Sequence, residues 1–323
     1  MATSYSTATL FQDIIDKAVV QEMTSNVLEG DSSRIQWDGG KEIKIAKVAV
    51  GSMKDYSRTG GYKKAQTSLA WESKTFNMDR GVRYDVDQMD INETKFIPSA
   101  SLLLGESART KISPELDAFR YSQIAKKAYA NGTTNGYIAN ESLTASNIFS
   151  KIFAALYAKA DLGFNLTDLR VFLPWTKYTQ LISSTEITKR IDPTQQPTDL
   201  KFQTRTIDGA LFIPVSSSRM KSGYTFNAGT DDDNDDGGYT ALTAALGINY
   251  LIVPQSAVMA KVKHQVSKII NPEQNQKYDG YSIYTRMYHD IFFMDNQVNG
   301  LWASFDAALP TTPTDAFNTI ATN

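Results

Sequence analysis

The chain has 323 residues, of which 41% are hydrophobic and 21% charged, and these values exclude wholesale disorder. Its formal net charge is −2, from 33 basic and 35 acidic residues, which argues against a dedicated nucleic-acid binder with a broad basic face. Cysteine is absent, so disulfides, thiol nucleophiles and cysteine-ligated zinc are excluded, and the chain suits a reducing cytoplasm.

The N-terminus carries no secretory signal, because no basic stretch precedes an apolar one. No run approaches the roughly 18 apolar residues that would span a membrane. We therefore expect a soluble protein that is made in the cytoplasm and has no membrane partner.

Residues 1–39 predict an N-terminal arm with one short helix. Apolar residues recur there at helical spacing, at Leu10, Ile14, Ile15, Ala18 and Val19. The segment is too small to bury this apolar face by itself, so we expect it to dock on another part of the protein or on a partner.

Residues 41–50 and 71–87 predict the two arms of a long β-hairpin, because both runs are rich in β-branched and aromatic residues. The second run alternates well from Phe76 onward, and a polar stretch containing Gly60 and Gly61 forms the tip. Arms of about 12–15 residues would project roughly 40–50 Å. An isolated two-stranded ribbon is marginal in water, so a partner is expected to hold it.

Residues 96–131 predict a long helix that would reach about 50 Å if it is nearly straight. Ser113 suits an N-cap and Pro114 suits the first helical position, which indicates a fresh start or a kink. Asn131 and Gly132 are typical of a helix stop.

Residues from about 140 to 263 predict an α/β lobe. A helix with Ser146 as its cap is expected to end near Gly163. Short apolar runs at 169–173, 210–215 and 250–253 predict buried strands, with prolines at or near their ends.

The last part of the chain, from 257 to 305, is expected to be rich in strands. The run 258–266 alternates between apolar and polar residues. Runs 283–294 and 301–305 predict a pair of strands across a loop that carries Asn299 and Gly300. The tail from Ala307, rich in Thr, Ala and Pro, is expected to be mobile.

The sequence does not indicate an enzyme. Only two histidines are present: His264 follows the apolar side of its strand, and His289 and Asp290 are adjacent and should point to opposite faces. A phosphate-binding loop, a dinucleotide fingerprint and a nucleophile elbow are all absent from the sequence. No cofactor is expected.

The acidic run 231–236 is the best metal candidate, because Asp232, Asn234 and Asp236 match the alternating oxygen ligands that open a calcium loop. The twelfth position of such a loop should be glutamate, and here it is Thr243. A solvated loop held extended by its like charges is the favoured alternative.

Basic residues gather near the predicted hairpin tip, at Arg58, Lys63 and Lys64, with Tyr56 and Tyr62 between them. Such a tip could bind nucleic acid, contact acidic patches on another subunit, or remain solvated. The slightly acidic net charge favours a protein partner over nucleic acid.

Seven sequence patches, in order, resemble the major capsid proteins of tailed bacteriophages, which have the Hong Kong 97-type shell fold. The patches are FNMDRG (76–81), DQMDINET (87–94), PELDAFR (114–120), LPWTKY (173–178), GALFIPV (209–215), YTRMYHD (284–290) and NGLW (299–302). Each patch is weak alone, but their order and spacing together are specific.

The resemblance implies an α+β fold with six segments. These are an N-terminal arm (1–39), an extended hairpin loop (40–88), a peripheral domain with a spine helix (89–131), an axial α/β domain (132–262), the return to the peripheral domain (263–305) and a mobile tail (306–323).

The resemblance also implies a structural protein that assembles as hexamers and pentamers into an icosahedral shell around double-stranded phage DNA. Expected partners are copies of itself, a separate scaffolding protein, a portal, and DNA held by non-specific contacts on the inner surface. The expected location is the virion capsid, after assembly in the cytoplasm of a bacterial host.

Within this interpretation, six residues are candidates for contacts between subunits: Arg58, Lys63, Lys64, Arg80, Asp85 and Asp87. An encapsulin-like bacterial nanocompartment shell is the alternative with the same fold. A calcium-dependent binding module or enzyme that uses the acidic run is a more remote alternative.

Overall fold

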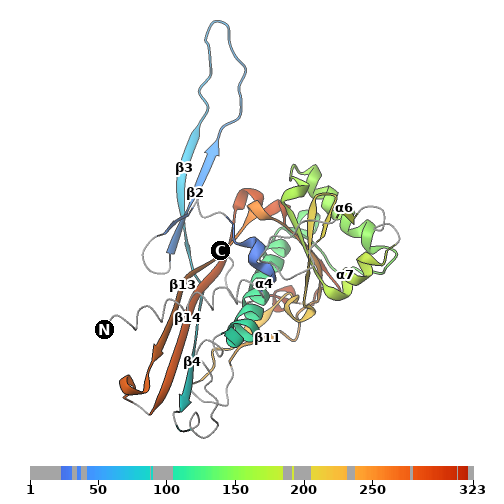
Figure 1. The fold of residues 1–323 in the computed structure, drawn as a ribbon. Coiled ribbons are helices and arrows are strands. Elements are labelled where there is room, and N and C mark those ends of the chain that lie inside the picture. Colours follow the sequence, from blue (N-terminus) through green and yellow to red (C-terminus); the bar gives the residue numbers. More distant parts are fainter. Residues whose placement is uncertain are drawn as a thin grey trace.

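The computed structural model describes residues 23–30, 35–37, 42–87, 89, 105–184, 191–192, 205–230, 237–276, 279–310 and 312–318. The expected helix at residues 10–19 lies outside this part of the chain. Helices and strands form three main assemblies: a projecting hairpin, a three-stranded sheet and an α/β lobe (Figure 1). None of the described helices is long and apolar enough to cross a membrane.

The hairpin consists of β2 (Glu42–Val50) and β3 (Thr67–Thr75), which pair antiparallel from Glu42↔Thr75 to Val50↔Thr67. A short strand, β1 (Ile35–Trp37), pairs with the other edge of β2. The hairpin extends well beyond the rest of the molecule, and residues 51–66 form its tip (Figure 1). Each arm has nine residues, fewer than the sequence predicted.

The run after Phe76 does not continue the hairpin, which corrects the prediction for residues 71–87. It forms β4 (Met78–Asp87), which pairs antiparallel with β14 (Gly280–Phe293), from His289↔Met78 to Gly280↔Asp87. On its other side β14 pairs with β13 (Val258–Ile270). We call the sheet formed by β13, β14 and β4 the three-stranded sheet. Alternation over Phe76–Asp87 predicted a strand correctly, but period two carries no information about the pairing partner.

The α/β lobe contains a seven-stranded sheet in the order β5-β15-β12-β6-β9-β8-β7. Its strands are β5 (Tyr137–Ile138), β6 (Leu169–Pro174), β7 (Ile191–Asp192), β8 (Arg205–Ile207), β9 (Ala210–Val215), β12 (Ile248–Pro254) and β15 (Trp302–Phe305). The three predicted strands are confirmed as β6, β9 and β12. A small sheet pairs β10 (Tyr224–Phe226) with β11 (Tyr239–Ala241).

The predicted pairing of runs 283–294 and 301–305 is wrong, because the two strands belong to different sheets. The first run lies in β14, whereas β15 lies between β12 and β5 in the lobe. The connection between them is the helical turn η9 (Asp295–Gly300) rather than a tight hairpin loop.

The long helix α4 (Ser113–Ala130) follows a π-helical segment, η3 (Ala108–Ile112), with no break between them. Ser113 therefore does not cap a new helix, and its Oγ donates instead to the carbonyl of Ala108 at 2.9 Å. The π turn places the change of geometry just before Pro114, whose missing N–H cannot continue the regular bonding pattern. The predicted stop is confirmed: α4 ends at Ala130, and Gly132 has a φ of 78°.

Two hydrophobic cores lie on opposite faces of the seven-stranded sheet. Successive residues of β12, such as Leu251 and Ile252, belong to different cores. One face packs against α4, and the other against α6 (Ile148–Asp161) and α7 (Trp175–Ile182). The predicted helix ending near Gly163 is confirmed as α6, but Asn147 and not the predicted Ser146 occupies the N-cap position. The period-two alternation thus fixes which helix each strand residue contacts.

The chain near its C-terminus packs on the body at residues 316–318, which corrects the expected mobile tail for these residues. Ala316, Phe317 and Asn318 are buried, and the Phe317 ring stacks on Tyr129 with 4.6 Å between centroids. Short helical turns complete the fold: η1 (Thr24–Leu28), α5 (Gly132–Asn135), η4 (Leu166–Asp168), η6 (Ser217–Arg219), η7 (Gln255–Ala257), η8 (Pro272–Gln274) and η10 (Pro313–Ala316).

Candidate functional site

Among the described residues, those that anchor the projecting hairpin to the body lie at its base. Ile43 and Ile45 of β2 pack with Phe76 against the buried side chains of Met259 and Phe292. The rings of Phe76 and Phe292 meet edge to face, with 5.2 Å between their centroids. The amide of Asn77 donates to Asp290 Oδ2 at 2.8 Å. These contacts hold the hairpin on the three-stranded sheet and leave residues beyond Val50 exposed.

The tip has a local structure of its own. Gly61 and Ser57 form an antiparallel bridge, and the amide of Gly60 donates to Ser57 Oγ at 3.1 Å. Lys54 Nζ donates to the carbonyl of Lys64 at 2.9 Å across the loop. Gly61 has a φ of 71°, a conformation that favours glycine and explains its place at the turn.

The predicted basic residues lie together at this tip. Arg58, Lys63 and Lys64 are exposed, and the rings of Tyr56 and Tyr62 meet edge to face with 5.0 Å between centroids. Residues 51–66 carry four basic side chains and one acidic one, a net charge of +3. Since the whole chain carries −2, the remainder carries −5. The tip is therefore a basic and aromatic surface opposed in sign to the rest of the molecule.

The other three predicted contact residues lie away from the tip, on β4. Arg80 forms an ion pair with Glu115 of α4, with 2.6 Å between Nε and Oε1, and its Nη1 donates to the carbonyl of Asn227 at 2.7 Å. Asp85 forms an ion pair with Arg83 at 2.8 Å. Arg80 thus joins β4 to the long helix within one chain.

Asp85 and Asp87 both accept hydrogen bonds inside the chain. Ser282 Oγ donates to Asp85 Oδ1 at 2.8 Å, and the amide of Met89 donates to Asp87 Oδ1 at 2.7 Å. Both residues remain exposed at the surface of the three-stranded sheet. Their predicted role in contacts between subunits stays a prediction.

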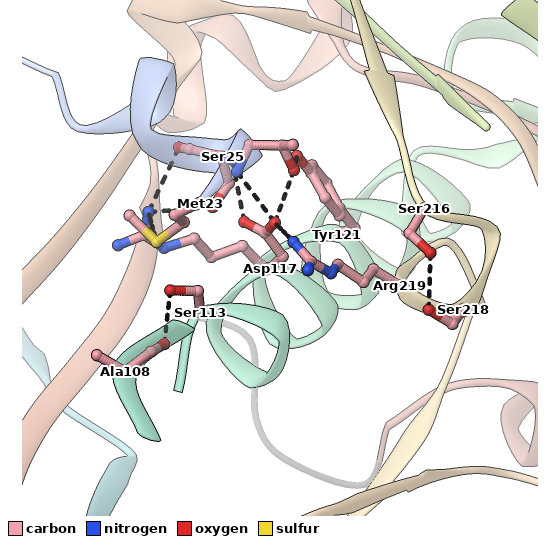
Figure 2. Close-up of polar contacts among 11 residues, drawn as sticks. Met23, Ser25, Ala108, Ser113, Asp117, Tyr121, Ser216, Ser218 and Arg219 are labelled. Atoms are coloured by element: carbon pink, nitrogen blue, oxygen red, sulfur yellow. Dashed lines mark hydrogen bonds and ion pairs between the residues drawn. The ribbon is translucent and has the colours of Figure 1, made fainter. Parts of the chain in front are cut away.

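A buried carboxylate, Asp117, joins three distant parts of the chain (Figure 2). Its Oδ2 accepts from Thr24 Oγ1 at 2.6 Å and pairs with Arg219 Nη1 at 2.9 Å, and its Oδ1 accepts from the amide of Ser25 at 3.0 Å. Burial raises the pKa of the adjacent Tyr121 phenol, and the charge of Asp117 raises it further. Asp117 therefore fixes η1 and η6 to α4.

Arg120, one turn further along α4, is also buried and binds the same N-terminal segment. Its Nη2 pairs with Glu29 Oε1 at 2.8 Å, and its Nη1 donates to the carbonyl of Ser25 at 3.3 Å. In the sequence, Asp117 and Arg120 stand out only as members of the PELDAFR patch. Two charged residues at i and i+3 on an otherwise apolar helix face were the available signal, whereas their partners, about 90 to 100 positions away, left none.

The His289–Asp290 pair behaves as predicted, with the two side chains on opposite faces of β14. His289 is buried against the Phe119 ring of α4 at 5.2 Å between centroids. Burial lowers the pKa of His289 to about 3, and the charges of Arg120 and Arg80 lower it as well. Asp290 faces the hairpin base. The side chain of His264 lies outside the described residues.

The calcium candidates Asp232, Asn234 and Asp236 lie outside the described residues. Within the part of the chain that the structure does describe, no group of three or more His, Asp or Glu side chains could hold a metal ion.

Comparison with known proteins finds no matching family model and no matching curated protein. Solved structures do match. The capsid of Cyanophage P-SCSP1u has a TM-score of 0.57 at 12% identity, over 84% of this chain and 85% of that chain. Mycobacterium phage Ogopogo has a TM-score of 0.53 at 11% identity, over 89% and 92%. Mycobacterium phage Che8 has a TM-score of 0.52 at 15% identity, over 88% and 91%.

These similarities define the fold. The chain has the α+β Hong Kong 97-type fold of phage capsid proteins, as the ordered sequence patches predicted. The division into arm, extended loop, peripheral and axial domains with the predicted boundaries stays a prediction.

Proposed function

We propose that this chain is a structural subunit, the major capsid protein of a tailed phage, which assembles as hexamers and pentamers into an icosahedral shell around double-stranded DNA. The observation that carries the proposal is the capsid fold combined with a projecting hairpin whose anchoring contacts, among the described residues, lie at its base. A fold alone does not define a function. The hairpin adds a physical requirement for a partner.

The hairpin is a poor element for an isolated molecule. A two-stranded ribbon buries little apolar surface, so it is marginal in water unless something packs against it. A shell supplies that contact, because a hairpin that extends beyond its own subunit can lie across the next one. The opposite charges of tip and body favour this arrangement between copies of the same chain.

The rest of the molecule is suited to keep its shape in such an assembly. The carboxylate of Asp117 and the guanidinium of Arg120 tie the segment at Thr24–Glu29 to the long helix. Subunits in a closed shell must make similar contacts in slightly different surroundings. A firmly tied body with an exposed projection meets that requirement.

The proposal includes partners and a location. A separate scaffolding protein and a portal would act during assembly in the bacterial cytoplasm. DNA would be held by non-specific contacts on the inner surface, since a net charge of −2 leaves no broad excess of basic groups for strong binding. The subunit would reside in the virion capsid.

Electron microscopy of the purified protein tests the proposal. We expect closed icosahedral shells, or rings of five and six subunits, in preparations of the full chain. A protein that stays monomeric at high concentration would contradict it. Particles from infected cells that contain enzymes instead of DNA would favour a nanocompartment.

Shortening the hairpin provides a second test. Replacing residues 52–65 by an Asn-Gly turn joins the two strands without their tip. Because the tip residues belong to no buried cluster in the described structure, we expect the subunit to keep its circular dichroism spectrum and to lose stable shells. Normal particles from this variant would contradict the role of the hairpin.

A further inference from the structure

The two faces of the hairpin have different compositions. In an antiparallel pair, directly opposite residues point to the same face, and so do residues two apart along one strand. The pairs Val50↔Thr67, Val48↔Leu69 and Ala46↔Trp71 therefore place Val50, Leu69 and Trp71 on one face. We call these three residues the apolar stripe.

The apolar stripe lies on the face directed away from the body. Ile43 and Ile45 belong to the opposite face of β2 and are the residues buried against the three-stranded sheet. The side chains of the stripe are strongly exposed, with Val50 at 75%, Leu69 at 66% and Trp71 at 51%. No other described element of this chain covers them.

The neighbouring positions on the opposite face are small or polar. Ser68 and Ala70 are also exposed, and Glu72 and Lys74 form an ion pair of 2.9 Å. The exposed apolar groups of this strand pair are therefore concentrated on one face. A row of three large apolar side chains, one of them tryptophan, is unusual for a surface that stays in water.

We propose that the apolar stripe is the docking face of the hairpin and that a second copy of this chain covers it. This inference rests on the proposed function and adds which face of the hairpin makes the contact. In Figure 1 the upper part of the hairpin projects away from the body of the same molecule. The tip carries +3 and the remainder of the chain −5, so the body of another copy attracts the hairpin.

Trp71 is expected to contribute most to the contact. Tryptophan in a desolvated position is typical of interface hot spots, and Trp71 lies nearest the anchored base, where the strand is held most firmly. The basic tip and its tyrosines then orient the hairpin, while the stripe supplies the apolar area that leaves water.

Glutamate substitutions at adjacent positions of β3 test the inference. Leu69→Glu and Trp71→Glu place a charge on the stripe, whereas Ser68→Glu and Ala70→Glu place the same charge on the opposite face. All four positions are exposed, so all four subunits are expected to fold. We expect the stripe variants to raise the subunit concentration needed for shells by about tenfold or more, and the control variants by less than about twofold.

Equal effects from the two faces, or no effect from the stripe, would overturn the inference. A photoreactive amino acid at position 71 of the purified chain provides a direct reading. We expect cross-links to a second copy, identified by mass spectrometry. Absence of such cross-links, or capture only of a different protein in infected cells, would also overturn it. A wild-type chain that forms no shells refutes the proposed function, and the cross-linking result then still decides the docking face.

Discussion

Asp117 and Arg219 form an ion pair of 2.9 Å in which the carboxylate is completely buried. The same carboxylate accepts hydrogen bonds from Thr24 and Ser25, so one side chain holds two segments, one about 90 residues before it and one about 100 residues after it in the sequence. Burying a charge is unfavourable unless it is paired and hydrogen-bonded, and here the partners come from two other elements, η1 and η6.

Replacing Asp117 by alanine is therefore expected to destabilise the subunit strongly. Removal of one partner from a buried ion pair typically costs about 3 to 5 kcal/mol. Denaturant unfolding of the unassembled subunit measures the change. Glu106→Ala, which breaks an exposed ion pair with Arg109, is the control and should leave the unfolding midpoint unchanged within error. Similar midpoints for the two variants would contradict the role of Asp117.

Arg80→Ala should affect the folded subunit, whereas Arg58→Ala should not. Arg80 is half-buried between Glu115 and the carbonyls of Asn227 and Gly238, so its loss leaves several groups without a partner and should cost roughly 1 to 3 kcal/mol. Arg58 is exposed at the tip. Thermal unfolding distinguishes the two variants. A stable Arg80→Ala subunit that fails only in assembly would instead support the prediction that Arg80 contacts another subunit.

His289 is expected to make the subunit sensitive to acid. Its pKa of about 3 in the folded state lies below the ordinary value of 6.5, so the unfolded chain binds the proton more readily. The contribution of neutral His289 to the free energy of unfolding is fully present above pH 6.5 and is lost as the pH falls toward 3. The difference in unfolding free energy between wild type and His289→Gln should shrink over this window and stay constant above it. A constant difference throughout would contradict the assignment.

Lys159 is expected to act in the alkaline range. Its Nζ donates to the carbonyls of Asn135 and Asn299 at 2.6 and 2.9 Å and lies 5.0 Å from the centre of the Trp302 ring. Burial lowers the pKa of Lys159 from 10.5 to about 8, so the unfolded chain holds its proton to higher pH.

Between these two values the stability of wild type should rise relative to Lys159→Met as pH increases. After allowance for partial solvent screening, the free energy of unfolding of wild type relative to the variant should increase by roughly 1 to 2 kcal/mol. Urea unfolding of both proteins from pH 7.5 to 10.5 measures it. A relative stability that falls with pH would contradict the shifted pKa.

Local patterns in the sequence predicted local structure well. The runs at β6, β9 and β12 are short and apolar, and Asn131–Gly132 stops α4 where expected, because these features depend on nearby residues. Pairing was harder. Phe76–Asp87 alternates as a strand should, but its partner β14 lies about 200 residues away. The sequence instead favoured pairing with the preceding run, 41–50.

The candidate site was predicted in part. The basic residues of the tip were found because charge and glycine are visible in sequence, and they lie together as expected. Arg80 forms an ion pair with Glu115 within one chain, a contact that the sequence did not show because it depends on β4 lying beside the long helix, and its role between subunits stays a prediction. The burial of Phe317 was not predicted, because the segment before it has the composition of a loop and its stacking partner, Tyr129, is distant in the sequence.

The pairing of β4 with β14 also constrains the order in which the chain can fold. These strands are separated by about 200 residues, so their sheet cannot form until most of the chain has left the ribosome. The hairpin base rests on Phe292 of that same sheet. A nascent chain released before Gly280 should therefore carry an unsupported hairpin, and limited proteolysis of such a truncation should cut within residues 42–87. The order of synthesis thus keeps the hairpin from being anchored until the subunit that carries it is nearly complete.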